Sequence, residues 1–283
     1  MNKENTEWDQ IILPKRGLFD LRLKQVWRYR DLLWLLVRRD FISFYKQTIL
    51  GPLWFVIQPL FTIGIYVFIF GKLAKISTDS IPLPLFYLTG ITAWTYFSDC
   101  LLKTANVFRE NASIFGKVYF PRLIMPISVV ISSLVKFVVQ LILLAVLMLY
   151  YKITGTALHF TGYIFAFPLF VIMMACLGLG LGLIVSSLTT KYRDFILFLS
   201  FGISFMMYAS PVVYPLSALP PKFALVLSFN PMATVIEGMR MALFGQGTID
   251  SLHIISAVVV TIVVLFTGAV VYTKVEKNFI DTI

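Results

Sequence analysis

Long apolar stretches alternate with short polar and basic stretches along most of the chain. Six of these stretches have the roughly 20 apolar residues that a helix needs to cross a bilayer. They lie at residues 50–70, 81–102, 123–151, 162–188, 195–214 and 252–272. The pattern predicts an all-α polytopic membrane protein with six transmembrane helices. An even number of spans places a segment at residues 1–27 and a tail at residues 273–283 on the same side of the membrane.

Residues 28–49, before the first span, have the pattern of an amphipathic helix. Four apolar side chains share one face of this helix, and three basic side chains fall opposite. They are Leu33, Val37, Phe41 and Phe44, and Arg38, Arg39 and Lys46. Asp40 falls within the apolar arc and needs a basic or aqueous partner. An interface helix on the membrane surface fits this pattern, and so does a juxtamembrane basic segment that only sets topology.

The connection after the second span, residues 103–122, is too polar to remain in lipid. Ile114, Phe115 and Tyr119 fall on one helical face within residues 109–122, which predicts a short interfacial helix. A structured loop at the headgroups is the alternative. A second compact charged connection, with Lys191, Arg193 and Asp194, lies on the same predicted side. Both are suited to docking a partner.

The region after the fifth span is broken by five prolines, which exclude one continuous spanning helix. They are Pro211, Pro215, Pro220, Pro221 and Pro231. Asn230 and Pro231 form a good helix start and Gly245 a good stop. The helix between them is about 21 Å long, too short to cross. Residues 220–245 are therefore predicted to form short re-entrant or surface-lying helices at the outer face, with Glu237 and Arg240 held within them.

Aromatic residues form a stripe on two of the predicted spans. In the first span Trp54, Phe61 and Phe68 recur every seven residues. In the fifth, rings recur at spacings of three and four, at Phe198, Phe201, Phe205 and Tyr208. Flat rings can stack on the C–H faces of sugars, which suits a conduit for a polymer. Lipid-facing or packing aromatics produce the same pattern.

A few polar and small residues interrupt the spans. Lys136, with Gln140 one turn later, is either a functional charge or a structural one that extends toward the cytoplasmic interface. Asp99 and Lys103 are four residues apart and are predicted to pair. The fourth span carries a row of small residues that predicts close helix packing within the subunit. This row is Gly178, Gly180 and Gly182.

The net charge of +10 reflects topology. Eighteen of the 24 Lys and Arg residues fall on one side if the spans alternate, and ten of them precede Gly51. This positive-inside bias places both ends of the chain in the cytoplasm. The basic residues are thus expected to meet anionic lipid, and the sequence argues against a nucleic-acid partner.

Catalysis has little support in the sequence. The spans contain almost no acidic residues, and no residues form a catalytic cluster or a metal-binding spacing. The phosphate-binding pattern G-x-x-x-x-G-K-[ST] is missing. We therefore expect neither catalytic residues nor cofactors on this chain, and any ATP that drives it must bind another protein.

Several motifs in order resemble one family. They are RYRDLLWLLVRRDFISFYKQTILGPLWFVIQPL, FYLTGITAW, NASIFGKVYFPR, KYRDF and SPVVYP followed by LPP and NP. Together they resemble the ABC-2 type permeases that export bacterial cell-surface polysaccharides, above all O-antigen exporters, with capsule and teichoic acid exporters as close relatives. The likeness extends over residues 28–276.

The resemblance implies a homodimer in the bacterial inner membrane, with two copies of a separate ABC ATPase that binds ATP and Mg. The substrate would be a lipid-linked polysaccharide, moving along a channel lined by the two aromatic spans of both subunits. Residues that would couple to the ATPase are Arg109, Glu110, Asn111, Ile114, Phe115, Lys117, Tyr119, Lys191, Arg193 and Asp194. Residues of the outer gate would be Pro220, Pro221, Asn230, Pro231, Glu237 and Arg240.

Two other functions remain open. One is an ABC-2 exporter of teichoic acid, capsule or a small lipid or drug. Another is a membrane-embedded enzyme of glycan assembly, which would need a polar catalytic cluster. A passive channel is disfavoured because the sequence has no ring of acidic residues and no carbonyl filter loop.

Overall fold

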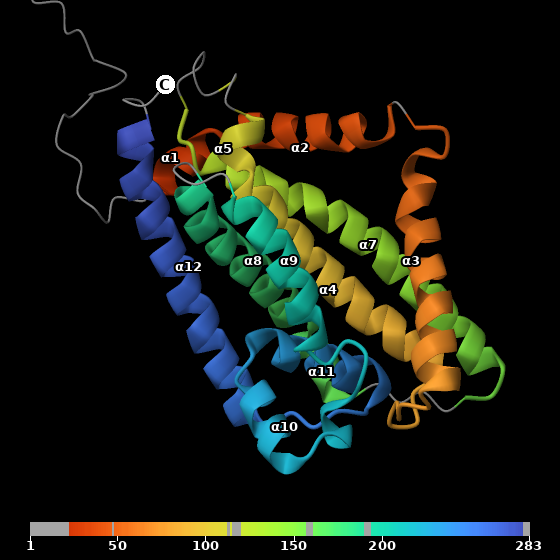
Figure 1. Cartoon of the computed structure of the whole chain (residues 1–283). Coiled ribbons are helices and arrows are strands. Elements are labelled where there is room, and N and C mark those ends of the chain that lie inside the picture. The colour runs from red at the N-terminus through yellow and green to blue at the C-terminus, as the bar shows by residue number, and fades with distance from the viewer. Residues whose placement is uncertain are drawn as a thin grey trace, which may run out of the picture.

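The chain forms a bundle of long inclined helices, with one helix lying across one end of the bundle (Figure 1). The structure is a computed structural model that describes residues 23–46, 48–111, 114, 120–156, 161–189 and 194–279. Every regular element in these ranges is a helix. The predicted all-α class is confirmed.

The elements fall into long bundle helices and short connecting ones. In order they are α1 (Leu23–Arg28), α2 (Arg30–Tyr45), η1 (Gly51–Leu53), α3 (Trp54–Tyr66), η2 (Val67–Leu73), α4 (Leu83–Ala105), α5 (Val107–Glu110), α7 (Ile124–Ile153), η3 (Gly162–Ala166), α8 (Phe167–Thr189), α9 (Phe195–Tyr208), η4 (Leu216–Ala218), α10 (Pro221–Ser228), α11 (Pro231–Phe244) and α12 (Ser251–Phe279).

Four helical stretches are long and apolar enough to cross a membrane. They are Gly51–Leu73, Ile124–Ile153, Gly162–Thr189 and Ser251–Val275, and they match the first, third, fourth and sixth predicted spans. α4 matches the second and has 23 residues, or about 34 Å. It is less apolar because other helices surround it, and Thr89, Thr92 and Thr104 are buried within the bundle.

The fifth span was predicted over residues 195–214, which is longer than the helix that forms there. α9 has only 14 residues and ends at Tyr208, or about 21 Å along its axis. Pro211 lacks a backbone N–H and restricts the residue before it, so the helix cannot continue through this point. The chain instead turns toward α10 and α11, at the opposite end of the bundle from α2 (Figure 1).

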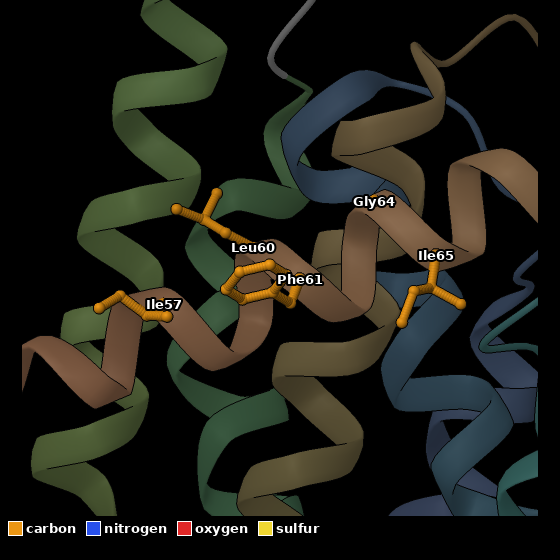
Figure 2. A pocket seen from close by; sticks show the side chains of 5 residues that line it. All are labelled: Ile57, Leu60, Phe61, Gly64 and Ile65. Carbon is orange, nitrogen blue, oxygen red and sulfur yellow. The ribbon is translucent and has the colours of Figure 1, made fainter.

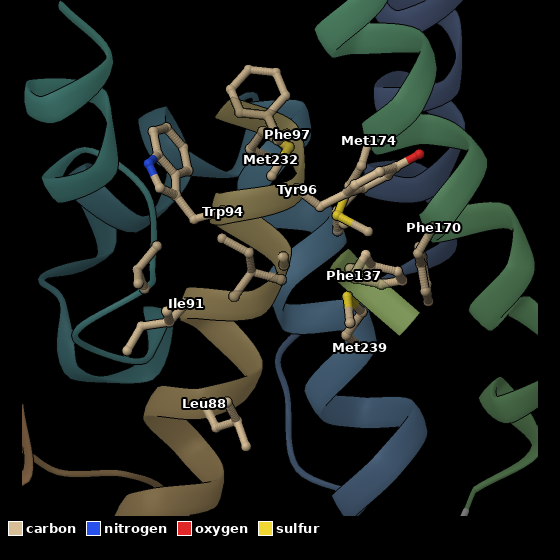
Figure 3. Close-up of a cluster of buried hydrophobic side chains, with 14 of the residues drawn as sticks. Leu88, Ile91, Trp94, Tyr96, Phe97, Phe137, Phe170, Met174, Met232 and Met239 are labelled. Carbon is tan, nitrogen blue, oxygen red and sulfur yellow. The ribbon is translucent and has the colours of Figure 1, made fainter. Parts of the chain in front are cut away.

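α4 is the centre of the hydrophobic core. Its buried side chains meet α7, α8 and α11, as in the group of Tyr96, Phe137, Phe170, Met174 and Met239 (Figure 3). The rings of Tyr96 and Phe137 join α4 to α7, with centroids 4.8 Å apart. α4 therefore holds the neighbouring helices in place.

Glycines allow α4, α8 and α12 to approach at backbone distance. A Cβ at Gly178 of α8 would lie 2.6 Å from the Cβ of Cys100 on α4. A Cβ at Gly268 of α12 would collide with the carbonyl oxygen of Gly180. In lipid, such close packing replaces the hydrophobic drive between helices. The predicted use of the glycine row for packing within the subunit is confirmed.

α2 lies across one end of the bundle, and the long helices run away from it (Figure 1). Leu36 and Val37 are buried against a second core cluster that includes Phe108, Ile124 and Tyr272. The helix ends at Tyr45, before the predicted limit at residue 49. The turn into α3 uses Gly51, whose φ of 52° lies in the left-handed region. The predicted amphipathic helix is therefore present, and α1 and the far end of α12 lie near it (Figure 1).

The glycine contacts give a stability prediction. Gly178→Ala should lower the free energy of unfolding by about 1–3 kcal/mol, because the added methyl group overpacks the α4–α8 contact. Gly202→Ala on α9 is the matched control, since a Cβ there meets nothing within 4 Å. Thermal unfolding in detergent measures both. Equal melting temperatures for the two variants would contradict the packing argument.

Candidate translocation surface and coupling elements

The two aromatic stripes are exposed on the single chain. Trp54, Phe61 and Phe68 of α3 and Phe198, Phe201, Phe205 and Tyr208 of α9 have exposed fractions between 44% and 72%. α3 stands at the rim of the bundle (Figure 1), and among the described side chains of α9 only Ile203 is buried. The rings are therefore excluded from the core, which rules out the packing explanation for the stripes within one subunit. Whatever surrounds these rings therefore comes from outside the single chain.

α3 also carries a shallow apolar hollow on its outer surface (Figure 2). Its volume is about 460 Å³, and Ile57, Leu60, Phe61, Gly64 and Ile65 line it. At Gly64 no side chain fills the hollow, and a Cβ placed there would meet nothing within 4 Å. The hollow is thus a place where another apolar surface can pack against α3.

A polar junction connects α2, α5 and α7. Arg39 Nη2 donates to Asp40 Oδ1 at 2.8 Å and to Asn111 Oδ1 at 3.3 Å. Ser132 Oγ of α7 donates to Asp40 Oδ2 at 3.3 Å. The requirement of Asp40 for a basic neighbour is therefore met by Arg39, next to it in the chain. These hydrogen bonds join α2, the transverse helix, to the end of α5 and to α7.

The other predicted coupling residues occupy different positions. Arg109 and Glu110 of α5 are exposed, Asn111 is buried, and Ile114 is half-buried against the second core cluster. Desolvation raises the pKa of the Glu110 carboxyl. Asp194 is exposed at the start of α9. Phe115, Lys117, Tyr119, Lys191 and Arg193 lie outside the described residues. A helix was predicted over residues 109–122. Within that range the structure describes the end of α5 at Glu110, Asn111, Ile114 and residues 120–122.

The second outer helix forms as its local signals predict. Asn230 Oδ1 accepts the backbone N–H of Met232 at 3.0 Å, Pro231 is the first helical residue, and Gly245 ends the helix with φ of 71°. Pro220 precedes α10, and Pro221 is its first residue. Of the two positions predicted for this helix, re-entrant or surface-lying, the surface-lying one is wrong for α11. This helix is almost entirely buried against α4, α8 and α12.

Glu237 and Arg240 form a buried ion pair in α11, with Nη1 and Oε1 3.1 Å apart. Arg240 Nη1 also donates to the carbonyl oxygen of Pro211 at 2.6 Å, and Nη2 donates to that of Val212 at 3.1 Å. Its guanidinium lies 3.5 Å from the ring centroid of Phe86. The pair thus attaches the chain after α9 to both α11 and α4.

These bonds satisfy backbone carbonyl groups of the irregular chain after α9, which is essential where water is scarce. Burial lowers the pKa of Arg240 to about 10, so the guanidinium remains charged at neutral pH. Burial raises the pKa of Glu237. Removing one partner of such a pair leaves an uncompensated buried charge. The pair is therefore a structural requirement of this end of the bundle.

Asp99 does not pair with Lys103, contrary to the prediction from spacing. It accepts a hydrogen bond from Lys136 Nζ of α7 at 3.0 Å, while Lys103 Nζ donates to Ser133 Oγ at 3.4 Å. The contact between α4 and α7 brings Lys136 within reach and keeps its charge inside the bundle. Lys136 therefore does not extend to the interface.

Sequence reasoning missed two parts of this arrangement. The Arg39–Asn111 bond joins residues 72 positions apart, and no local spacing indicates it. A polar row on α3, formed by Gln58, Thr62 and Tyr66, does have a signal, because these residues recur every four positions in an apolar span. Within the part of the chain that the structure describes, no group of three or more His, Cys, Asp or Glu residues is placed to hold a metal ion.

Comparisons with known proteins identify a family and several relatives. The model of the ABC-2 type transporter family matches residues 31–244. An O-antigen export system permease protein RfbA of Klebsiella pneumoniae is 29% identical over 251 residues, which cover 89% of this chain and 94% of that protein. The protein of the same name from Myxococcus xanthus is 26% identical, covering 92% and 98%.

A more distant relative is the polysialic acid transport protein KpsM of Escherichia coli. It is 24% identical over 234 residues, which cover 82% of this chain and 89% of that protein. The family match covers well over half of the chain and includes the transverse helix, the aromatic helices and α11. The chain is therefore a member of the ABC-2 type transporter family.

Proposed function

We propose that this chain is the permease subunit of an ATP-driven exporter that moves a lipid-linked polysaccharide of O-antigen type out of the cytoplasm. The similarity to O-antigen export permeases over about nine tenths of both chains carries this proposal. The polysialic acid transport protein is covered less completely and is less similar. Export of teichoic acid or capsule is the alternative within the same family.

The proposed topology has six spans in the bacterial inner membrane. α4 and α9 join the four long apolar stretches, with α9 reaching across together with the loop that Arg240 holds. Both termini are cytoplasmic, because most of the basic residues then fall on the inner side. α2 lies at the inner surface, and α10 and α11 lie at the outer end, where they cover the exit as gate helices.

ATP and Mg bind to a separate ABC ATPase, of which two copies join two permease chains. The cytoplasmic contact is formed by α5 and the connections near residues 112–119 and 190–194. A movement imposed on Asn111 reaches α2 through Arg39 and α7 through Asp40 and Ser132. This junction supports a role in coupling ATP hydrolysis to movement of the spans.

The polysaccharide passes between two permease chains, along the exposed faces of α3 and α9. In a homodimer these faces of both subunits form the channel, and the aromatic rings stack on successive sugars without selecting one hydroxyl pattern. The hollow on α3 offers an apolar surface for the partner chain. The exposed rings are then explained by substrate and partner contacts.

The first prediction concerns energy coupling. When the permease is reconstituted in proteoliposomes with its partner ABC ATPase, purified lipid-linked polysaccharide should stimulate ATP hydrolysis. A complex of ATPase and permease with a Walker A lysine substituted in the ATPase is the control for background hydrolysis. Hydrolysis that is indifferent to polysaccharide would contradict the proposed function.

The second prediction concerns the aromatic faces. Trp54→Ala and Tyr208→Ala should each slow export about fivefold, the factor that corresponds to losing a stacking contact of about 1 kcal/mol. Ile142→Ala and Val259→Ala are matched controls, because these side chains are equally exposed on α7 and α12. Surface polysaccharide is measured in cells, with permease abundance determined in parallel. Equal export by all four variants would exclude the aromatic track.

A further inference from the structure

A polar cavity lies where α3, α4, α7 and α9 meet. Its volume is about 120 Å³, which is room for about four water molecules at their liquid volume of about 30 Å³ each. Its polar lining includes Gln58, Thr62 and Tyr66 of α3 and Lys136 and Gln140 of α7. A cavity of this size takes one or two polar substituents of a larger molecule, together with water.

Gln140 defines what the cavity needs. Its side chain is 2% exposed, and its Oε1 atom has no hydrogen-bond partner among the described residues. A buried acceptor without a donor is costly, and such groups are usually satisfied by water or a ligand. The occupant must therefore donate a hydrogen bond to Gln140.

Two polar neighbours of Gln140, Lys136 and Thr62, are bonded to other groups. Lys136 Nζ donates to Asp99 at 3.0 Å, and Thr62 Oγ1 donates to the carbonyl oxygen of Gln58 at 3.0 Å. Tyr66 has only a weak acceptor, the sulfur of Met207 at 4.0 Å. Because Asp99 balances the charge of Lys136, the cavity is not selective for anions. It suits a neutral group that both donates and accepts hydrogen bonds, which is the chemistry of a hydroxyl.

The position of the cavity connects it to the two aromatic helices. Tyr66 of α3 and Met207 of α9 approach each other across it, and Met207 immediately precedes Tyr208 of the aromatic stripe. Trp94 of α4 adds an aromatic ring to the lining. Rings bind the apolar faces of sugars, and a recess of amide and hydroxyl groups beside them can bind the sugar hydroxyls.

We propose that this cavity is a hydroxyl-binding subsite of the translocation path. It holds water when no substrate is present, and a hydroxyl group of the passing polysaccharide replaces a water molecule and donates to Gln140 Oε1. This proposal rests on the proposed export function. Gln140, held deep between the four helices, is the residue that identifies the subsite.

The test compares Gln140→Met with Gln140→Glu in the reconstituted permease–ATPase complex. Methionine keeps the volume and removes the acceptor, whereas glutamic acid keeps an acceptor. The half-saturating concentration of purified lipid-linked polysaccharide and the maximal rate of stimulated ATP hydrolysis are measured for each. Thr267→Val is the control, because the Thr267 hydroxyl on α12 is exposed and bonds only to its own helix.

The subsite predicts that Gln140→Met raises the half-saturating concentration about two- to tenfold, the effect of one hydrogen bond, with maximal and unstimulated rates unchanged. Gln140→Glu should remain within twofold of the natural protein. An unchanged half-saturating concentration in Gln140→Met would overturn the subsite alone. Equal loss of rate in both variants would also overturn it and assign Gln140 to packing. A natural complex that polysaccharide does not stimulate would refute the export function, and the subsite with it.

Discussion

The close contacts of α8 with α4 on one side and with α12 on the other are the constraint on which the rest of the structure depends. Helices in lipid gain no hydrophobic stabilisation from meeting each other. Their association must therefore be stabilised by close packing of their surfaces. Gly178 and Gly268 bring the backbones together where any side chain would separate them. The result is a dense block around α4, and the other helices are positioned relative to this block.

α3 and α9 remain at the edge of that block, and this explains their composition. Few of their side chains are buried, and their aromatic stripes are exposed. α9 is also too short to complete a span by itself. The chain after it is held by Arg240 and Glu237, which bond to the backbone at Pro211, Val212 and Leu216. A rigid core thus carries two helices whose outer faces are available to a substrate and a second subunit.

Local signals were sufficient for part of the fold. The apolar stretches predicted five long helices as spans; four of them are long and apolar enough to cross a membrane, and the other, α4, is long but less apolar. Asn230, Pro231 and Gly245 predicted both ends of α11, because caps depend on neighbouring residues. The fifth span was predicted too long, since apolar composition continues past Tyr208 although Pro211 interrupts the helix.

The failures arose where tertiary contacts decide the outcome. Asp99 has a basic residue four positions away, yet it pairs with Lys136 because α7 packs against α4. The burial of α11 depends on where α8 and α12 lie, which its own sequence does not encode. The spacing of the aromatic residues was enough to find the two stripes. Only the structure shows that these side chains are exposed.

The proposed export function requires that the exposed faces of α3 and α9 border a hydrated path shared by two chains. Spin labels at Phe61 and Phe201, and at Ile142 and Val259 for comparison, test it in lipid with the ATPase bound. The account predicts that a water-soluble nickel complex relaxes the labels at 61 and 201, while only oxygen relaxes those at 142 and 259. Relaxation by oxygen alone at all four positions would show that these aromatic faces meet lipid and would contradict the account.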